Sequence, residues 1–139
     1  MPMPLHAAVT ILVVDDEQAI VRGLARLLRR DGATVDTAEN GQRALALLQE
    51  QRYDIILCDL HMPHLNGPTL YAILTSQYPA LRSRVIFLTG DTLRPESLTF
   101  LEQCGQPWLA KPCTIAAVRS VIAHVLCVAP PWRPLSQAL

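Results

Sequence analysis

Five short apolar runs, separated by longer stretches with helical periodicity, limit what this chain can fold into more than any other feature. Each run has the length of a strand, and most are apolar almost throughout, which is typical of strands covered on both faces. They are TILVV (10–14), the alternating ATVDT (33–37), DIILC (54–58), RVIFL (84–88) and PWLA (107–110). The regular order of strand and helix predicts an α/β domain, with a parallel sheet between two layers of helices.

Five helices are predicted between and after these strands. In residues 17–30, Ile20, Leu24, Leu27 and Leu28 recur at helical spacing and line one face. The other helices are predicted after an N-cap at Asn40, with Ala44, Leu45 and Leu48 on its apolar face, and over Gly67–Gln77, Arg94–Gln103 and Thr114–Val128.

Glycine and proline predict several boundaries of these elements. Asp31-Gly32 and Gly105 are typical helix stops, and Pro95 suits the first turn of a helix. Pro107 favours an edge position or a strand start for the fifth strand, because proline cannot donate to a ladder.

The chain has 139 residues, of which 50% are hydrophobic, and this suits a single domain with one core region. We expect a domain over residues 9–128, an N-terminal extension over 1–8 and a proline-rich tail over 129–139 that is loose or begins a linker.

Charge and hydropathy argue against two classes of partner. Twelve basic and twelve acidic residues cancel, so no net positive field is available for nucleic acid or an anionic membrane. No apolar run reaches the roughly 18 residues of a membrane span, and residues 1–10 do not resemble a signal peptide. A cytoplasmic protein is therefore expected.

Two further groups of side chains have ordinary explanations. The arginines of the first predicted helix fall at near-helical spacing and are expected to form a solvated face: Arg22, Arg26, Arg29 and Arg30. The cysteines form no C-x-x-C pair and are expected to be reduced thiols in or near the core: Cys58, Cys104, Cys113 and Cys127.

Polar residues follow four of the strands directly. These are Asp15-Asp16-Glu17 after the first, Asp59 after the third, Thr89-Gly90-Asp91 after the fourth and Lys111-Pro112 after the fifth. In an open parallel sheet the carboxyl ends of the strands share one edge, and ligands bind there at the topological switch point. We therefore expect these side chains to form one cluster.

The charges of this cluster indicate what it binds. Two carboxylates about 4 Å apart repel by about 4 kcal/mol at an effective dielectric constant near 20, so several acids need a cation. Mg²⁺ prefers a few carboxylates and phosphate oxygens, and Lys111 can donate to an oxyanion. Each motif alone is common in solvated turns and caps, and their joint order is what predicts a phosphoryl site beside a metal.

With these residues in view, the chain resembles a response-regulator receiver domain, the phosphoacceptor module of two-component signalling. The resemblance covers residues 9–128 and is carried by VVDDE, by D-x-x-M-P-x-x-N-G from Asp59 to Gly67, by FLTG and by LAKP. It implies a flavodoxin-like sheet of strand order 2-1-3-4-5. It also implies a phosphohistidine donor on a histidine kinase or a phosphotransfer protein.

The resemblance further implies a role for each site residue. Asp59 would be the phosphoacceptor, and Mg²⁺ would be held by Asp16, Asp59 and the backbone carbonyl of His61, with Asp15 acting through water. Thr89 and Lys111 would contact the phosphoryl oxygens, and Lys111-Pro112 would be a cis peptide. The domain would thus catalyse its own phosphorylation and dephosphorylation without being a metabolic enzyme.

Switching would involve Thr89 and Trp108, and a downstream protein would bind the face formed by the fourth helix, fifth strand and fifth helix. This sequence departs from the family pattern at three positions. His61 lies where the family varies and tunes dephosphorylation, Trp108 replaces the usual Tyr or Phe, and Cys113 follows Lys-Pro. Whether His61 steers water or crowds it is left open.

Three alternatives are weighed. A pseudo-receiver that works by protein contacts alone is disfavoured by the intact acids, Thr89 and Lys111. A haloacid-dehalogenase-like phosphatase would need a second Asp at the position of His61, and a nucleotide-binding domain would need a glycine-rich turn after the first strand. The segment from Thr89 to Pro112 is also similar to the receivers of hybrid histidine kinases, which favours such an origin.

Overall fold

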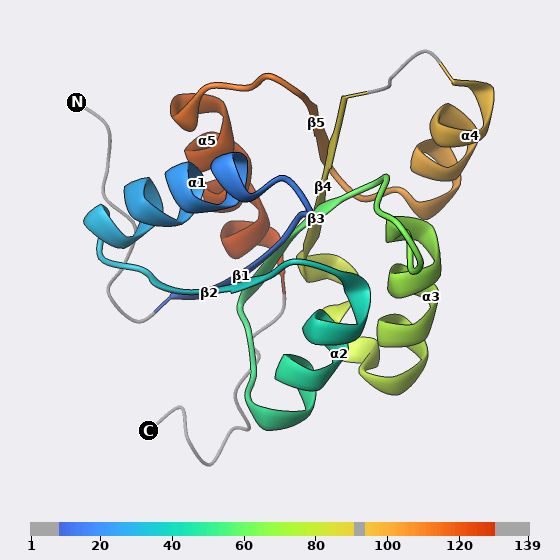
Figure 1. The fold of residues 1–139 in the computed structure, drawn as a ribbon, viewed down its shortest axis with the longest axis horizontal. Coiled ribbons are helices and arrows are strands. Elements are labelled where there is room, and N and C mark those ends of the chain that lie inside the picture. The colour runs from blue at the N-terminus through green and yellow to red at the C-terminus, as the bar shows by residue number, and fades with distance from the viewer. Residues whose placement is uncertain (1–8, 91–93, 130–139) are drawn as a thin grey trace.

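The protein is described here as a computed structural model, over residues 9–90 and 94–129. Five parallel strands form one sheet in the order β2-β1-β3-β4-β5, with helices on both faces (Figure 1). The strands are β1 (Thr10–Val14), β2 (Thr34–Ala38), β3 (Ile55–Asp59), β4 (Val85–Thr89) and β5 (Trp108–Ala110). This architecture confirms the predicted fold class and strand order. The predicted extension over 1–8, residue Asp91 and most of the tail lie outside the described residues.

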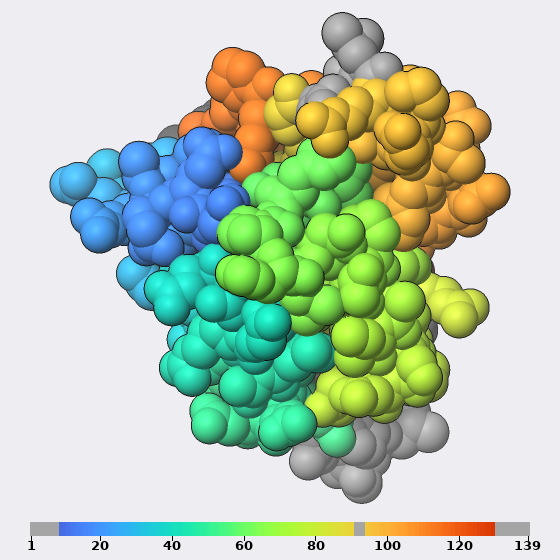
Figure 2. Space-filling view, turned by 45° about the vertical axis from the view of Figure 1, so that its right-hand side comes forward, coloured from blue at the N-terminus to red at the C-terminus, as the bar shows by residue number. Residues whose placement is uncertain are grey.

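Helices α1 and α5 cover one face of the sheet, and α2, α3 and α4 cover the other (Figure 1). The helices are α1 (Gln18–Arg30), α2 (Gly41–Glu50), α3 (Gly67–Gln77), α4 (Pro95–Cys104) and α5 (Ile115–Val128). A 3-10 helix, η1 (Pro79–Arg84), precedes β4 and was not predicted. Figure 2 shows the outer surface of the layer formed by α2, α3 and α4.

Alternate residues of the central strands enter two separate cores. On β3, Ile56 and Cys58 pack toward α2 and α3, whereas Ile55 and Leu57 pack toward α1 and α5. This alternation follows from the period of two along a strand, and all four side chains are almost fully buried. Burying an aliphatic side chain of this kind contributes about 1.5–3 kcal/mol, so the central strands are the best anchored part of the sheet.

Side-chain caps and glycines set several helix ends as predicted. Asn40 Oδ1 accepts a hydrogen bond of 2.7 Å from the amide of Arg43, which begins α2. Gly32 and Gly105 follow α1 and α4 with φ of 98° and 70°, a conformation that costs other residues more than glycine.

Three strands end one residue later than predicted. β2 ends at Ala38, β3 at Asp59 and β4 at Thr89. The reason is that these last residues still pair within the ladder: Ala38 lies opposite Val14, Asp59 opposite Leu88 and Thr89 opposite Ala110. The side chains of Asp59 and Thr89 are therefore fixed in the last residue pairs of the sheet, whereas Asp15 and Lys111 directly follow the ends of β1 and β5.

The remaining predictions about composition are largely confirmed. The four arginines of α1 are exposed, and the four cysteines are free thiols. Cys58 is buried and Cys104 and Cys113 are partly buried, but the expectation of a near-core position is wrong for Cys127. Its position on α5 faces outward, away from the packed residues Val118, Ile122 and Val125. Among the helices of the described residues, none combines the length and hydropathy that crossing a bilayer requires.

Candidate functional site

Asp59 stands at the carboxyl end of β3, between β1 and β4, with only 4% of its surface exposed. Gly67 allows the start of α3 to lie against this strand end, because a Cβ there would come within 2.8 Å of the carbonyl oxygen of Asp59. Asn66 caps the same helix by accepting a hydrogen bond of 2.9 Å from the amide of Thr69. Asn66-Gly67 is therefore more than a turn: Asn66 caps α3, and Gly67 lets the backbone of α3 approach the end of β3.

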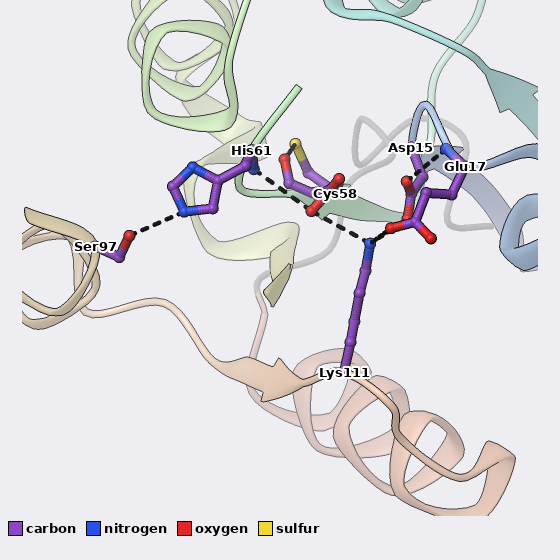
Figure 3. Close-up of polar contacts among 7 residues, drawn as sticks. Asp15, Glu17, Cys58, His61, Ser97 and Lys111 are labelled. Carbon is purple, nitrogen blue, oxygen red and sulfur yellow. Dashed lines mark hydrogen bonds and ion pairs between the residues drawn. The ribbon is translucent and has the colours of Figure 1, made fainter. Parts of the chain in front are cut away.

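Asp15 meets Asp59 from the end of the neighbouring strand β1, and Lys111 reaches it from the end of the edge strand β5. Lys111 Nζ lies 2.7 Å from Asp15 Oδ2, 3.4 Å from Asp59 Oδ1 and 3.4 Å from Glu17 Oε1. Figure 3 shows the lysine extending from the end of β5 toward Asp15 and Glu17. Its own backbone amide donates to the carbonyl of Thr89 at 2.7 Å, and the Lys111-Pro112 peptide is cis, as the resemblance implied.

The electrostatics of this cluster favour binding of further cations and disfavour a bare negative charge on Asp59. Burial raises the pKa of Asp59, and the charge of Asp15 raises it further, to about 7, despite the opposing effect of Lys111. Burial lowers the pKa of Lys111, but the hydrogen bond to Asp15 and the charges of Asp59 and Glu17 more than offset this and give a net rise. Lys111 is therefore held as a cation, and the negative charge of Asp59 beside it is only partly neutralised.

Three carboxylates can offer ligand atoms to a single ion. Oxygens of Asp15, Glu17 and Asp59 all lie within 4.8 Å of one another. This donor set fits Mg²⁺ or a similar hard cation, which binds a few carboxylates and keeps several waters. Glu17 was visible in the VVDDE motif but was not predicted as a ligand.

Asp16 is exposed and lies outside that three-residue set, so its role as a metal ligand stays a prediction. It does line the open cavity above Asp59, which has a volume of about 350 Å³. The other lining residues are Glu17, Asp59, His61, Gly90, Arg94 and Lys111. Arg94 was missed by sequence reasoning, because it begins a helix and no strand-end motif marks it.

Thr89 and Trp108 lie two rungs apart on the β4–β5 ladder. Thr89 is fully buried and pairs with Ala110, whereas Trp108 pairs with Phe87 and has 38% of its surface exposed. Thr89 ends β4 as Asp59 ends β3, so both lie at the carboxyl ends of the strands. Trp108 lies on β5, the outermost strand of the sheet. Their joint role in switching stays a prediction.

His61 lies beside the acid cluster, and its two ends contact different parts of the protein. Its backbone amide donates to Asp59 Oδ1 at 3.4 Å, a long hydrogen bond. Its ring Nε2 lies 3.0 Å from Ser97 Oγ on α4, and Figure 3 shows the ring turned away from Lys111. The serine partner lies 36 residues further along the chain, and no sequence motif indicated it.

The strand order, the acids at two neighbouring strand ends and the lysine at a third define one family. The model of the response regulator receiver domain matches residues 11–123, and the chain belongs to this family. It is accordingly a receiver domain of two-component signalling.

Particular relatives agree with this assignment. The chain is 32% identical over 110 residues to the probable transcriptional regulatory protein TcrX of Mycobacterium tuberculosis, a match that covers 79% of this chain and 46% of TcrX. The signal receiver domain of a signal transduction histidine kinase from Syntrophus aciditrophicus superposes with a TM-score of 0.79 at 28% identity, covering 93% of this chain and 99% of that one.

A third relative bears on the metal. The response regulator TrrA of Thermotoga maritima, solved in complex with Mg²⁺ and BeF, superposes with a TM-score of 0.73 at 25% identity, covering 85% of this chain and 99% of that one. The present chain spans less than half the length of the curated relatives it matches.

Proposed function

We propose that Asp59 accepts a phosphoryl group from a phosphohistidine of a histidine kinase or histidine phosphotransfer protein. The observation that carries this assignment is the position of the Asp59 carboxylate, at a central strand end, 3.4 Å from Lys111 and at the base of an open cavity. In the transfer, a carboxylate oxygen attacks phosphorus, the N–P bond breaks, and its electron pair leaves with the imidazole of the donor.

The residues around Asp59 stabilise the charge that develops on the phosphoryl oxygens. Lys111 is already poised as a cation within reach of Asp59 and Asp15. Thr89 follows Leu88 at the next strand end and would donate its hydroxyl to a second phosphoryl oxygen. The open space around the Gly90 Cα admits the incoming group, since a Cβ there would meet nothing within 4 Å.

We also propose that Mg²⁺ is the metal of this site. When bound, it neutralises charge on the transferring oxygens and orients them for an in-line displacement. Asp15, Glu17 and Asp59 offer ligand atoms close together, and Asp16 and the backbone carbonyl of His61 are the further candidates that the family resemblance implies. A shallow site of this kind binds Mg²⁺ weakly, since several waters remain on the ion.

The finished acyl phosphate is a signalling state that the domain itself removes by hydrolysis. A downstream protein would bind the face formed by α4, β5 and α5, and no binding of nucleic acid or a membrane by this domain is proposed. Cytoplasmic location and origin in a hybrid histidine kinase also stay predictions.

Incubation with acetyl phosphate and Mg²⁺ tests the assignment of Asp59. Intact-mass measurement should show one added phosphoryl group in the parent, none in Asp59→Asn and normal labelling in Glu50→Gln, which alters an exposed acid at the end of α2. Asparagine has the shape of aspartate, so circular dichroism should show a folded protein. Undiminished labelling of Asp59→Asn would refute the phosphoacceptor assignment, and a pseudo-receiver would show no labelling of the parent.

A further inference from the structure

The loop of residues 60–66, between β3 and α3, carries the backbone that lies next to the phosphoacceptor. It follows Asp59 directly, and the amide of His61 donates to Asp59 Oδ1 at 3.4 Å. His61 also lines the cavity above Asp59. The position of this loop therefore decides where these backbone groups lie relative to the carboxylate.

A leucine of the loop lies against a glycine of α2. A Cβ added to Gly41, the first residue of α2, would come within 2.5 Å of Leu65 Cδ2, 2.7 Å of Leu65 Cγ and 2.9 Å of Leu65 Cβ. Leu65 is half-buried and packs against the core shared by α2 and α3. Figure 2 shows the segment after β3, in green, lying against α2, in turquoise. Glycine at position 41 is therefore what lets Leu65 approach the start of α2 so closely.

Backbone conformation does not account for the glycine at position 41. Its φ lies outside the left-handed range that Gly32 and Gly105 adopt, so the same backbone suits alanine. What distinguishes Gly41 is the space taken by Leu65. Because the Cβ of Leu65 is itself among the atoms that are too close, a change of the leucine rotamer cannot make room for a methyl group. The loop backbone or the start of α2 would have to move.

The loop is held in a conformation that it would leave if released. Among the described residues, His64 is the only one other than glycine with a positive φ, of 69°. Such a backbone persists where the surrounding contacts over-determine it. Those contacts are the hydrogen bond of 3.0 Å from the amide of Gly67 to the carbonyl of Leu60 and the packing of Leu65 on Gly41.

We propose that Leu65, held against Gly41, is a positioning residue for the phosphoacceptor site. It fixes the 60–66 loop, and the loop in turn keeps the backbone of His61 beside Asp59. The proposal rests on the proposed function of Asp59. The start of α2 would thereby take part in phosphoryl transfer, although none of the described residues that line the cavity belongs to α2.

Gly41→Ala tests this role, with Gly23→Ala as the matched control. We expect Gly41→Ala to slow labelling by limiting acetyl phosphate about 10- to 100-fold, because a displacement of about 1 Å at a reacting centre has effects of this size. A Cβ at Gly23, on α1, would meet nothing within 4 Å, so Gly23→Ala should be labelled like the parent.

Mg²⁺ binding gives a readout that is independent of phosphoryl transfer. The backbone carbonyl of His61 is among the candidate ligands, so a displaced loop should weaken binding. Calorimetry should show an affinity about tenfold lower in Gly41→Ala, the effect of disturbing groups that orient metal ligands. Gly23→Ala should bind Mg²⁺ like the parent.

Removal of the leucine side chain should suppress the effect of the added methyl group. Leu65→Ala deletes Cγ and Cδ2, the two atoms that lie nearest to an added Cβ at position 41. In this background, Gly41→Ala should slow labelling by no more than about threefold, whereas independent effects would multiply. The amide resonances of residues 60–66 should shift in Gly41→Ala and return toward their parent positions in the double variant.

Leu65→Ala alone should be labelled at a rate between those of the parent and Gly41→Ala, because the loop loses one of its contacts. Leu126→Ala removes the same atoms from a half-buried leucine of the opposite core and should be labelled like the parent. This pair decides the question if Gly41→Ala does not fold. Equal labelling rates for Leu65→Ala and Leu126→Ala would then overturn the positioning role.

The outcomes separate this proposal from the proposed function. Parent-like labelling of Gly41→Ala, or equal slowing by Gly41→Ala with and without the Leu65 side chain, would overturn the positioning role and leave Asp59 as the phosphoacceptor. Absence of labelling in the parent protein would overturn both.

Discussion

The centre of the sheet and its β5 edge differ sharply in how firmly they are held. Every residue of β3 and β4 is buried, whereas none of the three residues of β5 is. The acids Asp15 and Asp59 come from the centre, and Lys111 comes from the end of the edge strand. The site thus combines a fixed pair of carboxylates with a cation on a weakly anchored element.

This difference indicates which part of the molecule can change conformation at a low free-energy cost. Moving β3 would disturb both cores, but moving β5 and α4 disturbs mainly Phe100, Leu101 and Leu109 and the hydrogen bond at Ser97. Because Lys111 contacts Asp59 directly, a charge change at the centre is transmitted first to this edge. We therefore expect substitutions in the two regions to affect different properties.

The first prediction compares two aromatic residues that are directly opposite on β4 and β5. Phe87 is fully buried, with ring centroids 5.5 Å from Tyr71 and 5.2 Å from Phe100, whereas Trp108 is 38% exposed. Phe87→Ala should lower the free energy of unfolding by about 3–5 kcal/mol, the usual cost of a large core cavity. Trp108→Ala should cost only about 1–2 kcal/mol, because part of its surface is already solvated.

Urea unfolding of the three proteins, fitted with a common slope, measures both values. The parent protein serves as the reference, and the acetyl phosphate assay checks that Trp108→Ala is still labelled. Equal losses for the two substitutions would contradict the distinction between centre and edge.

The second prediction concerns the stability of the centre as a function of pH. The pKa of Asp59 is raised from 3.8 to about 7, chiefly by burial and then by Asp15. Between these two values the folded protein binds a proton that the unfolded chain has lost, so its stability falls as pH rises through this window. Above pH 7 the ionised carboxylate is therefore destabilising in the absence of metal.

Asp59→Asn should consequently raise the free energy of unfolding at pH 8 by about 2 kcal/mol. A shift of roughly three units corresponds to about 4 kcal/mol, and loss of the ion pair with Lys111 offsets part of it. The advantage should shrink as pH falls from 7 toward 4. Thermal and urea unfolding in EDTA at several pH values would measure it, with Glu50→Gln as the control. If the stability advantage of Asp59→Asn instead grew as the pH fell, the folded-state pKa of Asp59 would not be raised and this prediction would be wrong.

Features of the fold and the site that depend on local turn chemistry or on the order of the strands were predictable from the sequence. The cap at Asn40, the stop at Gly105 and the meeting of Asp59 with Lys111 follow from turn chemistry and from the common edge of parallel strands. Each depends on residues a few positions apart or on the sheet order, so the pattern of the chain was sufficient.

Features that depend on side-chain packing between distant segments were not predictable. The contact of His61 with Ser97, the place of Glu17 among the metal-ligand candidates and the outward position of Cys127 depend on rotamers and helix rotation. The 3-10 turn η1 was missed because Tyr78-Pro79 indicated only that α3 ends, while the short turn that follows carries no helical periodicity.

The last prediction concerns the smallest effect, a movement of the edge without unfolding of the centre. Thr89 is buried at the end of β4, and Trp108 is half-exposed on β5, so a phosphoryl group that draws the Thr89 hydroxyl toward it would open space for the Trp108 ring. Trp132 is the second tryptophan of the chain, and a Trp132→Phe protein reports Trp108 alone. Beryllofluoride with Mg²⁺ should shift its emission to shorter wavelength, because the ring moves from partial exposure into a less polar environment.

Two substitutions at Thr89 determine whether the movement depends on its hydroxyl. Thr89→Ala should reduce the emission shift and Thr89→Ser, which keeps the hydroxyl, should retain most of it. Binding of beryllofluoride is verified separately by its fluorine resonance in each protein. If the emission stays unchanged while beryllofluoride is bound, Trp108 does not move with the site. The face between α4 and β5 would then respond to phosphorylation by a route that does not involve the Trp108 ring.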